Sequence, residues 1–354
     1  MKRSLTLSLF FVFLISCNQS PQTVTGLPDS EILSIDSAEM TNDFYDNTET
    51  ISFTIPEVLI GGEIANPGIV DFSSLSRRSV IVKETLLDQE GGDRFVGAYR
   101  YDGYSLFDIL KNTVVRKENE EEFNSVIDLF VEVENAAGEK AVFSWGEIYY
   151  PNNLHRIIIA DRVSRIVPSK TNDLWTLPSE CRIVAGNDLI TERNISSPVK
   201  ITVRSFPRSF AVTKGMSPMF SKQISLFTDG SPSGTITGFP AGAGVVTYNT
   251  IFYGRGKGIH STEPFSGVML KDVISPFFTL TRTNLRSGIM CIAAEDGYRS
   301  TASFSEIFNR NDQQELLLVK TQADEDGGLF RIFPACDFFS DRAIKSVKEI
   351  HLGY

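Results

Sequence analysis

Histidine is scarce in this chain of 354 residues, which contains only His155, His260 and His351. The three are far apart and none has the spacing of a zinc-binding pair, so the sequence predicts no metal site. Basic residues are also few: 34 Lys and Arg against 44 Asp and Glu give a net charge of −10. Because phosphate binding requires basic patches, this balance argues against a nucleic-acid partner.

Cysteine is almost as rare, and its four copies form no CxxC pattern typical of a metal or redox centre. Cys17 lies near the N-terminus. The other three allow at most one disulfide in an oxidising compartment, and the sequence leaves the pairing among them open. They are Cys181, Cys291 and Cys336.

Long apolar runs are limited to one, from Ser4 to Ile15, which follows the basic start Lys2-Arg3. It is shorter than the roughly 20 residues that a membrane-spanning helix needs, but it has the length and flanks of a signal-peptide core. The run ends in Leu14-Ile-Ser-Cys17, which resembles the lipobox of bacterial lipoproteins. The resemblance implies that residues 1–16 are removed. An ordinary secretory signal with a chance cysteine is the alternative.

In that family the thiol of the first mature residue carries a diacylglyceryl group, so Cys17 is the predicted lipidation site. Acyl chains hold a protein stably to a bilayer. The resemblance therefore implies an exported protein that is lipid-anchored in the bacterial cell envelope, at the outer membrane or the periplasmic face. The next stretch is acidic, with no Lys or Arg between Arg3 and Arg77. Its low hydrophobicity predicts a flexible tether over residues 17–50.

The rest of the chain is internally repeated. Three blocks recur in the same order: 101–110 with 265–274, 138–160 with 297–319, and 182–193 with 331–342. The offset falls from 164 to 159 to 149, which places ten extra residues of the first copy between Asp161 and Leu177. Because three ordered matches indicate a duplication, we expect domains over 51–205 and 223–354, joined by a linker over 206–222.

Each copy shows many short β-branched strands and two short helices. One helix should open in the Gly-x-x-Leu-x-Asp block that begins at Gly103 and Gly267. The other should begin at the capping boxes Ser144–Glu147 and Ser303–Glu306. This mixture predicts an α+β class.

Several motifs together resemble the sulfite-oxidase-type molybdopterin-binding domain. They are Gly62-Glu-Ile-Ala-Asn-Pro67, the Tyr101-x-Gly-x-x-Leu block, the hairpin Asp296-Gly-Tyr298, and a final Arg-[Ile/Leu]-[Val/Phe]…Asp…Arg segment. The resemblance implies two tandem copies of a mostly-β sulfite-oxidase-like molybdopterin-binding fold. It also implies a molybdopterin cofactor and oxidoreductase activity in members that keep the metal ligand.

That ligand, a cysteine thiolate at the end of the strand before the Tyr-x-Gly block, is missing here. The corresponding segments are 85–88 and 251–254, and neither contains cysteine. A soft thiolate is what holds a molybdenum centre beside its dithiolene. We therefore expect no cofactor, with bound molybdopterin as the alternative.

The duplicated polar residues are candidate structural or binding residues: Arg182, Asp188, Arg193, Arg331, Asp337 and Arg342, with Glu147 and Glu306 beside them. A binding role would use the arginines as bidentate anion sites. A structural role would pair Arg182 with Asp188 or a nearby carboxylate, and Arg331 likewise with Asp337 or a carboxylate near it. The charged run 116–122 is interpreted as a solvated loop or helix face.

The glycine-rich stretch 254–260 is a second candidate site. Arg255, Lys257 and His260 add positive charge to freed backbone N–H groups, so they are candidate anion- or cofactor-binding residues. The stretch lacks the ending of a P-loop, and a plain surface loop is the alternative.

No catalytic residues are predicted. The sequence favours a cofactor-free binding or accessory module at the cell envelope, whose partner is an unknown envelope protein or a small anionic ligand. The alternative is a molybdopterin-dependent oxidoreductase with altered metal ligation.

Overall fold

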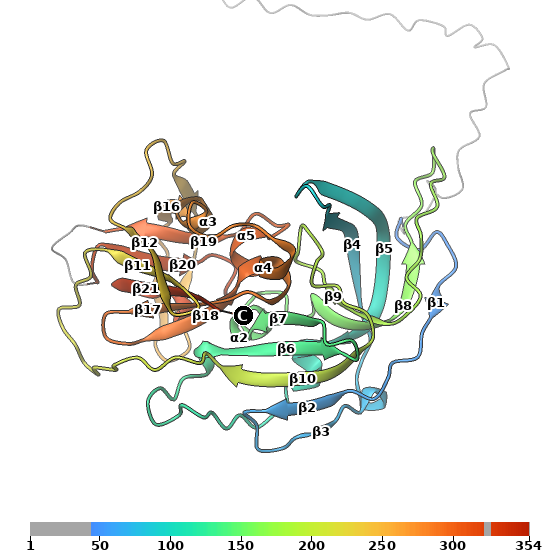
Figure 1. The fold of residues 1–354 in the computed structure, drawn as a ribbon, viewed down its shortest axis with the longest axis horizontal. Helices are drawn as coiled ribbons and strands as arrows, with labels where there is room; N and C mark the ends of the chain where they lie inside the picture. Colours follow the sequence, from blue (N-terminus) through green and yellow to red (C-terminus); the bar gives the residue numbers. More distant parts are fainter. Residues whose placement is uncertain (1–43, 322–326, 354) are drawn as a thin grey trace, which may run out of the picture.

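The computed structural model of the protein describes residues 44–321 and 327–353 (Figure 1). The predicted signal segment 1–16, the lipidation residue Cys17 and most of the tether 17–50 lie outside these ranges. No helix within the described ranges combines the length and apolarity needed to cross a bilayer.

The first half of the described chain forms two five-stranded sheets. One has the order β1-β8-β5-β4 with β9 beside β8: β1 (Ile51–Ser52), β4 (Arg78–Leu87), β5 (Asp93–Ser105), β8 (Ile157–Arg165) and β9 (Arg182–Ala185). The other has the order β3-β2-β10-β6-β7: β2 (Leu59–Gly62), β3 (Gly68–Ile69), β6 (Leu129–Asn135), β7 (Lys140–Ser144) and β10 (Pro198–Ser205). Short helices interrupt the strands: η2 (Phe72–Ser74), α1 (Leu106–Leu110), η3 (Val126–Asp128) and α2 (Trp145–Tyr149).

The second half forms a five-stranded sheet, a four-stranded sheet and a hairpin. The five-stranded sheet has the order β12-β11-β21-β17-β18: β11 (Ile224–Thr228), β12 (Ser231–Ile236), β17 (Ile289–Ala294), β18 (Arg299–Ser303) and β21 (Val347–Gly353). The four-stranded sheet has the order β13-β16-β19-β20: β13 (Val246–Tyr248), β16 (Phe265–Met269), β19 (Leu316–Lys320) and β20 (Phe330–Pro334). The hairpin and the helices are β14 (Phe252–Gly254), β15 (Gly258–Ser261), α3 (Leu270–Ile274), α4 (Arg282–Ser287), α5 (Phe304–Phe308) and η4 (Ser340–Arg342).

The strand order of one half recurs in the other. The path β3-β2-β10-β6-β7 corresponds to β12-β11-β21-β17-β18, and the path β4-β5-β8-β9 corresponds to β13-β16-β19-β20. Each five-stranded path contains one parallel pair, β10 with β2 and β21 with β11. The connection between β8 and β9 is longer than the equivalent connection between β19 and β20, and it lies in the stretch where the sequence offsets place the extra residues.

The predicted fold class, α+β with two tandem copies of a sulfite-oxidase-like molybdopterin-binding fold, is wrong. The chain is mostly β, with 41% strand and 11% helix, and its four small sheets have a β-propeller-like arrangement. The helix signals in the sequence are real but local: each α-helix has only five or six residues. Because such short helices have little stability of their own, they cap strand ends and build no helical layer.

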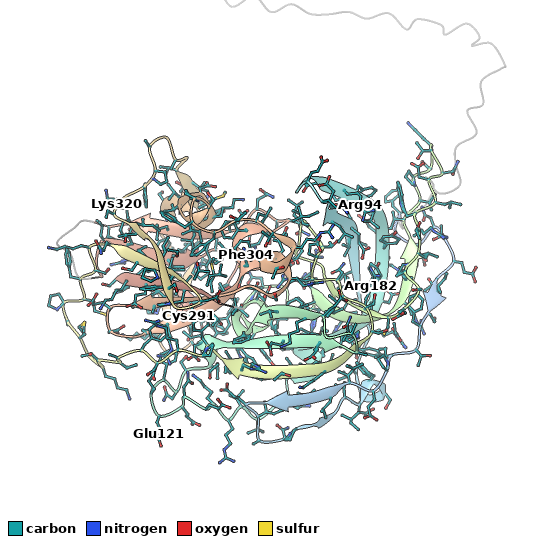
Figure 2. All side chains as sticks on the ribbon, in the orientation of Figure 1. Arg94, Glu121, Arg182, Cys291, Phe304 and Lys320 are labelled. Atoms are coloured by element: carbon teal, nitrogen blue, oxygen red, sulfur yellow. The ribbon has the colours of Figure 1, made fainter. Side chains whose placement is uncertain are left out.

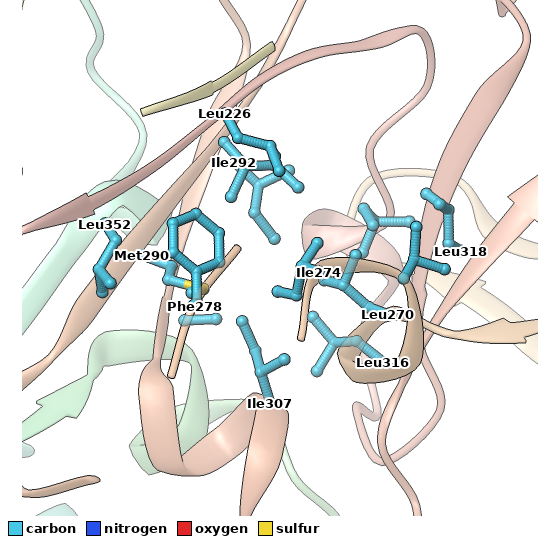
Figure 3. Close-up of a cluster of buried hydrophobic side chains, with 14 of the residues drawn as sticks. Leu226, Leu270, Ile274, Phe278, Met290, Ile292, Ile307, Leu316, Leu318 and Leu352 are labelled. Carbon is cyan, nitrogen blue, oxygen red and sulfur yellow. The ribbon is translucent and has the colours of Figure 1, made fainter. Parts of the chain in front are cut away.

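Each half has its own apolar core, and each core receives a side chain from the other half. The core of the second half is shown in Figure 3. Leu87 and Ile190 of the first half belong to that core, while Tyr298 and Phe339 of the second half pack against the core of the first. Ile190 and Phe339 are equivalent positions, 149 residues apart. The exchange therefore ties the halves together in a reciprocal way.

Candidate functional site

Most of the duplicated polar residues meet where the two halves touch. We call this contact surface the seam; it is formed by α2, α5 and the segments 187–193 and 336–342. On the side of the first half, Arg193 is almost fully buried and lies between two carboxylates. Its Nη2 is 2.6 Å from Asp188 Oδ1, and its Nη1 is 2.9 Å from Glu147 Oε1.

The second half repeats this triad. Arg342 Nη2 is 2.7 Å from Asp337 Oδ1 and 2.5 Å from Glu306 Oε1, and all three side chains are buried. An arginine that reaches two carboxylates makes strong, geometrically specific contacts. The duplicated Asp and Arg residues at the seam therefore have internal partners.

Serine hydroxyl groups connect the two triads. Ser144 Oγ donates to Glu306 Oε2 at 2.7 Å across the seam, and Arg342 Nη1 is 3.4 Å from the same hydroxyl. In the other direction, Arg193 Nη1 donates to Ser303 Oγ at 3.2 Å. The predicted capping box is complete at Ser144 but not at Ser303, because the carboxylate of Glu306 turns toward Ser144 and Arg342.

Backbone contacts across the seam are reciprocal as well. The Phe338 N–H donates to Tyr150 O at 2.7 Å, and the Leu189 N–H donates to Asn309 O at 2.8 Å. Asn309 is 159 residues after Tyr150, and Phe338 is 149 residues after Leu189, as the repeat requires. In an interface with two-fold character, residue i contacts residue j, and the residue equivalent to i contacts the residue equivalent to j. The seam is a pseudo-two-fold interface within one chain.

The charges of the two triads do not balance pairwise, since two arginines face four carboxylates, with Arg310 as a further buried cation near Asp188 and Glu306. Burial raises the pKa of Glu147, and the neighbouring Glu306 raises it further, against the opposing effect of Arg193. Burial also acts on Glu306, but Arg342 and the hydrogen bonds from Arg342 and Ser144 outweigh it and lower its pKa. Glu306 is thus the carboxylate that is stabilised in its charged form, and Glu147 is the one that favours its proton.

This difference predicts unequal effects of two equivalent substitutions. Glu306→Gln should lower the free energy of unfolding more than Glu147→Gln, because only Glu306 is stabilised as an anion. Because the folded-state pKa of Glu147 is raised above its ordinary value, its contribution to the stability of the wild type should be lost as the pH rises from 4.5 through the raised pKa. Urea unfolding across this pH range tests both points: Glu147→Gln should flatten the decrease, and equal losses in the two variants would contradict the assignment.

Arg182 pairs with a nearby carboxylate, the second possibility that the sequence left open, and not with Asp188. Asp188 and Asp337 pair with Arg193 and Arg342 instead. Arg182 lies on β9, from which its Nη1 reaches Glu84 Oε1 of β4 at 3.0 Å.

Glu84 is a buried acceptor for several groups: its Oε1 also accepts from Tyr101 Oη at 2.9 Å and from Asn194 Nδ2 at 3.1 Å. Arg331 lies on β20, in the position that corresponds to Arg182 on β9. The sequence spacing of Arg and Asp was a poor guide because the strand directs Arg182 toward its sheet and the following loop carries Asp188 to the seam.

The candidate residues Arg255, Lys257 and His260 lie on the β14–β15 hairpin. Arg255 Nε is 2.8 Å from Asp341 Oδ1, so its charge is already compensated within the chain. The side chain of Lys257 is exposed. The ring of His260 is also exposed and lies 5.4 Å from the ring of Phe252, centroid to centroid. The hairpin therefore does not gather the three cations around one empty position.

The residues where the resemblance would place a molybdenum ligand do not fit that role. The Thr191 N–H donates to Thr85 O, and the Thr85 N–H donates to Thr191 Oγ1. The aromatic ring of Tyr253 packs near Phe338. The three thiols in the described chain are free and buried, and burial raises the pKa of Cys291 and Cys336. They are thus disfavoured as thiolates. Cys291 lies between the halves (Figure 2) in a small apolar cluster with Phe130.

A Ser-His-Asp grouping that the sequence did not suggest occurs at α1. Ser105 Oγ lies 2.9 Å from Asp108 Oδ2 and 3.1 Å from His155 Nδ1. In a hydrolytic triad the histidine stands between the carboxylate and the hydroxyl. Here one ring nitrogen of His155, Nδ1, faces both Ser105 Oγ and, at 3.5 Å, Asp108 Oδ2, and Ser105 is fully buried as the cap of α1. The geometry is that of a helix cap.

Two surface grooves remain open at the junction of the halves. The first, with a volume of about 240 Å³, is called the acidic groove; it is lined by 120–125, 212–214, Asp296 and Tyr298. The second, of about 270 Å³, is called the balanced groove; it is lined by Glu132, 138–140, Val142, Arg286 and Ser287. The balanced groove lies between the β6–β7 hairpin and the segment that precedes β17, and the acidic groove lies between the β17–β18 hairpin and the segment that precedes β6. The grooves are thus related by the pseudo-two-fold.

Buried charged side chains fix the loop that lines the acidic groove. Lys117 Nζ is 2.5 Å from Asp128 Oδ1, and Arg299 of the second half reaches Asp128 and Glu122 at 3.2 and 2.9 Å. Lys117 and Arg299 also lie 4.9 and 4.5 Å from the centroid of the Phe123 ring. The interpretation of 116–122 as a solvated segment is therefore wrong for Lys117, which is buried.

Comparisons with protein families and with curated proteins give no match. Within the described ranges, no three His, Cys, Asp or Glu side chains are grouped to hold a metal ion.

Proposed function

We propose that the protein is a lipid-anchored component of the bacterial cell envelope, whose β-rich body serves as a cofactor-free binding or accessory module. The observation that carries the proposal is the state of the seam. The buried arginines and carboxylates of both triads form ion pairs with one another, and these contacts stabilise a scaffold. Concave surface remains open beside them in the two grooves. Clefts at such junctions are common places for ligands.

The proposal is tested by the metal content of protein purified from its native host. We expect molybdenum and tungsten well below one atom per chain, because segments 85–88 and 251–254 supply no thiolate. Either metal at one atom per chain would overturn the cofactor-free proposal. A variant of the same protein, Arg255→Ala, shows whether any such metal depends on the hairpin.

Anchoring makes a separate prediction. Cys17→Ala should leave the protein unprocessed or release it from the membrane fraction, because no thiol would remain to carry the lipid. Fractionation and labelling with a radioactive fatty acid would show the difference. Cys181→Ala is the matched control and should stay membrane-bound and labelled. A Cys17→Ala protein that is still attached and labelled would contradict the lipidation site.

A further inference from the structure

The two grooves have equivalent positions but different charges. The balanced groove has two carboxylates, Glu132 and Glu139, and two cations, Lys140 and Arg286. Arg286 Nη1 is 2.9 Å from Glu139 Oε1, and Lys140 Nζ is 3.5 Å from Glu132 Oε1. A guanidinium group of the chain itself thus lines this groove, and the charges of the groove are compensated.

Fewer of the charges in the acidic groove are compensated. Four carboxylates line it, Glu120, Glu121, Glu122 and Asp296, against the single ammonium group of Lys214. Of the four, Glu122 is paired with Arg299. Glu120 and Glu121 are exposed, and Figure 2 shows Glu121 at the outer edge of the molecule. An open groove therefore faces solvent with an excess of negative charge.

The walls of this groove are rigid and partly aromatic. Tyr298 lies in an edge-to-face contact with Phe123, with ring centroids 5.6 Å apart, and its Oη donates to Asp341 O at 2.6 Å. The loop that carries Glu120 and Glu121 is fixed by Lys117 and Arg299. Carboxylates beside an aromatic wall attract organic cations by charge and by the ring quadrupole. Because the loop and the aromatic wall are held in place without a ligand, binding would mainly require the side chains of Glu120 and Glu121 to become ordered.

We infer that the acidic groove binds a guanidinium or alkylammonium group, in the position where the equivalent groove holds Arg286. Its volume is below the roughly 300–1,000 Å³ of pockets for drug-sized ligands, so it accepts a small cation or one side chain. The net charge of −10 increases the encounter rate with such cations. This inference rests on the proposed binding function and names the chemical class of its ligand.

The test uses the full chain and two probes, agmatine and a hexapeptide with one central arginine, in isothermal titration calorimetry at low and at physiological salt. Both probes should bind, and their affinity should be lower at physiological salt because salt screens the charges of the groove. Glu120→Gln/Glu121→Gln should lower the affinity roughly tenfold, as expected for the loss of charged hydrogen bonds. Lys214→Met should raise the affinity, since it removes the cation that competes for the groove.

The controls isolate the groove and the charge. Glu139→Gln, in the balanced groove, should leave the affinity unchanged, and a hexapeptide with citrulline in place of arginine should bind at least roughly tenfold more weakly. A peptide that binds far more tightly than agmatine identifies a protein side chain as the ligand, and the reverse identifies a free cation. Absence of binding to both probes, equal binding of citrulline, or no effect of the double variant would overturn the inference. None of these outcomes depends on the metal content or on Cys17, which test the proposed function separately.

Discussion

Arg342→Ala should lower the free energy of unfolding by about 3–5 kcal/mol, the typical cost of removing one partner from a buried ion pair. Arg342 is 2% exposed and supports both Asp337 and Glu306. Without it, two carboxylates remain buried with no guanidinium, and burial then raises their pKa. A folded-state pKa above the unfolded value gives stability as the pH falls. The deficit of the variant should therefore be largest near neutral pH and should shrink toward pH 4.

The matched control is Arg255→Ala. Arg255 also pairs with an aspartate, but about half of its side chain is exposed. Exposed pairs typically contribute about 0–1 kcal/mol. Urea unfolding of both variants at pH 7 and pH 4.5 makes the comparison. Equal losses for Arg342→Ala and Arg255→Ala would show that the seam does not stabilise the protein as its geometry indicates.

Gly146→Ala should also destabilise the protein, against the expectation from helix propensity. Gly146 lies in α2, where alanine is normally favoured over glycine by about 1 kcal/mol. A Cβ at this position would lie 2.3 Å from the Cζ and Nη1 atoms of Arg342. Arg342 cannot move away without leaving Asp337 and Glu306. We expect a loss of about 2–4 kcal/mol, close to that of disrupting the triad itself.

Gly68→Ala is the control for this substitution. Nothing lies within 4 Å of a Cβ added at Gly68, so the change should have little effect. Thermal unfolding of the two variants, followed by circular dichroism, is sufficient. If Gly146→Ala were as stable as the wild type, the position of Arg342 against α2 would be wrong.

The sequence predicted much of the local structure and which positions of the two halves are equivalent. The capping serines Ser144 and Ser303, the turns at Gly138 and Gly297, and most strand positions follow from residue type and spacing. These features depend on neighbours along the chain. The fold class did not follow, because helices of five residues leave the same sequence signals at their N-termini as longer ones.

The seam could not be predicted for a different reason. Arg182 and Arg193 both belong to the repeated blocks, so sequence does not distinguish their roles. The path of β9 brings Arg182 to Glu84, and the path of the following loop brings Arg193 to Glu147. The acidic groove was equally hidden. Glu122 and Arg299 are 177 residues apart, and the charged run containing Glu122 has the composition of an ordinary solvated loop. Long-range pairing of this kind leaves no local pattern.

The two halves form one body through the pseudo-two-fold seam, and differential scanning calorimetry of residues 44–354 would show this. The reciprocal triads and the exchange of Ile190 and Phe339 between cores predict one cooperative transition, with equal calorimetric and van't Hoff enthalpies. Arg342→Ala should move that whole transition to a lower temperature. Two separate transitions, of which only one responds to Arg342→Ala, would contradict the account.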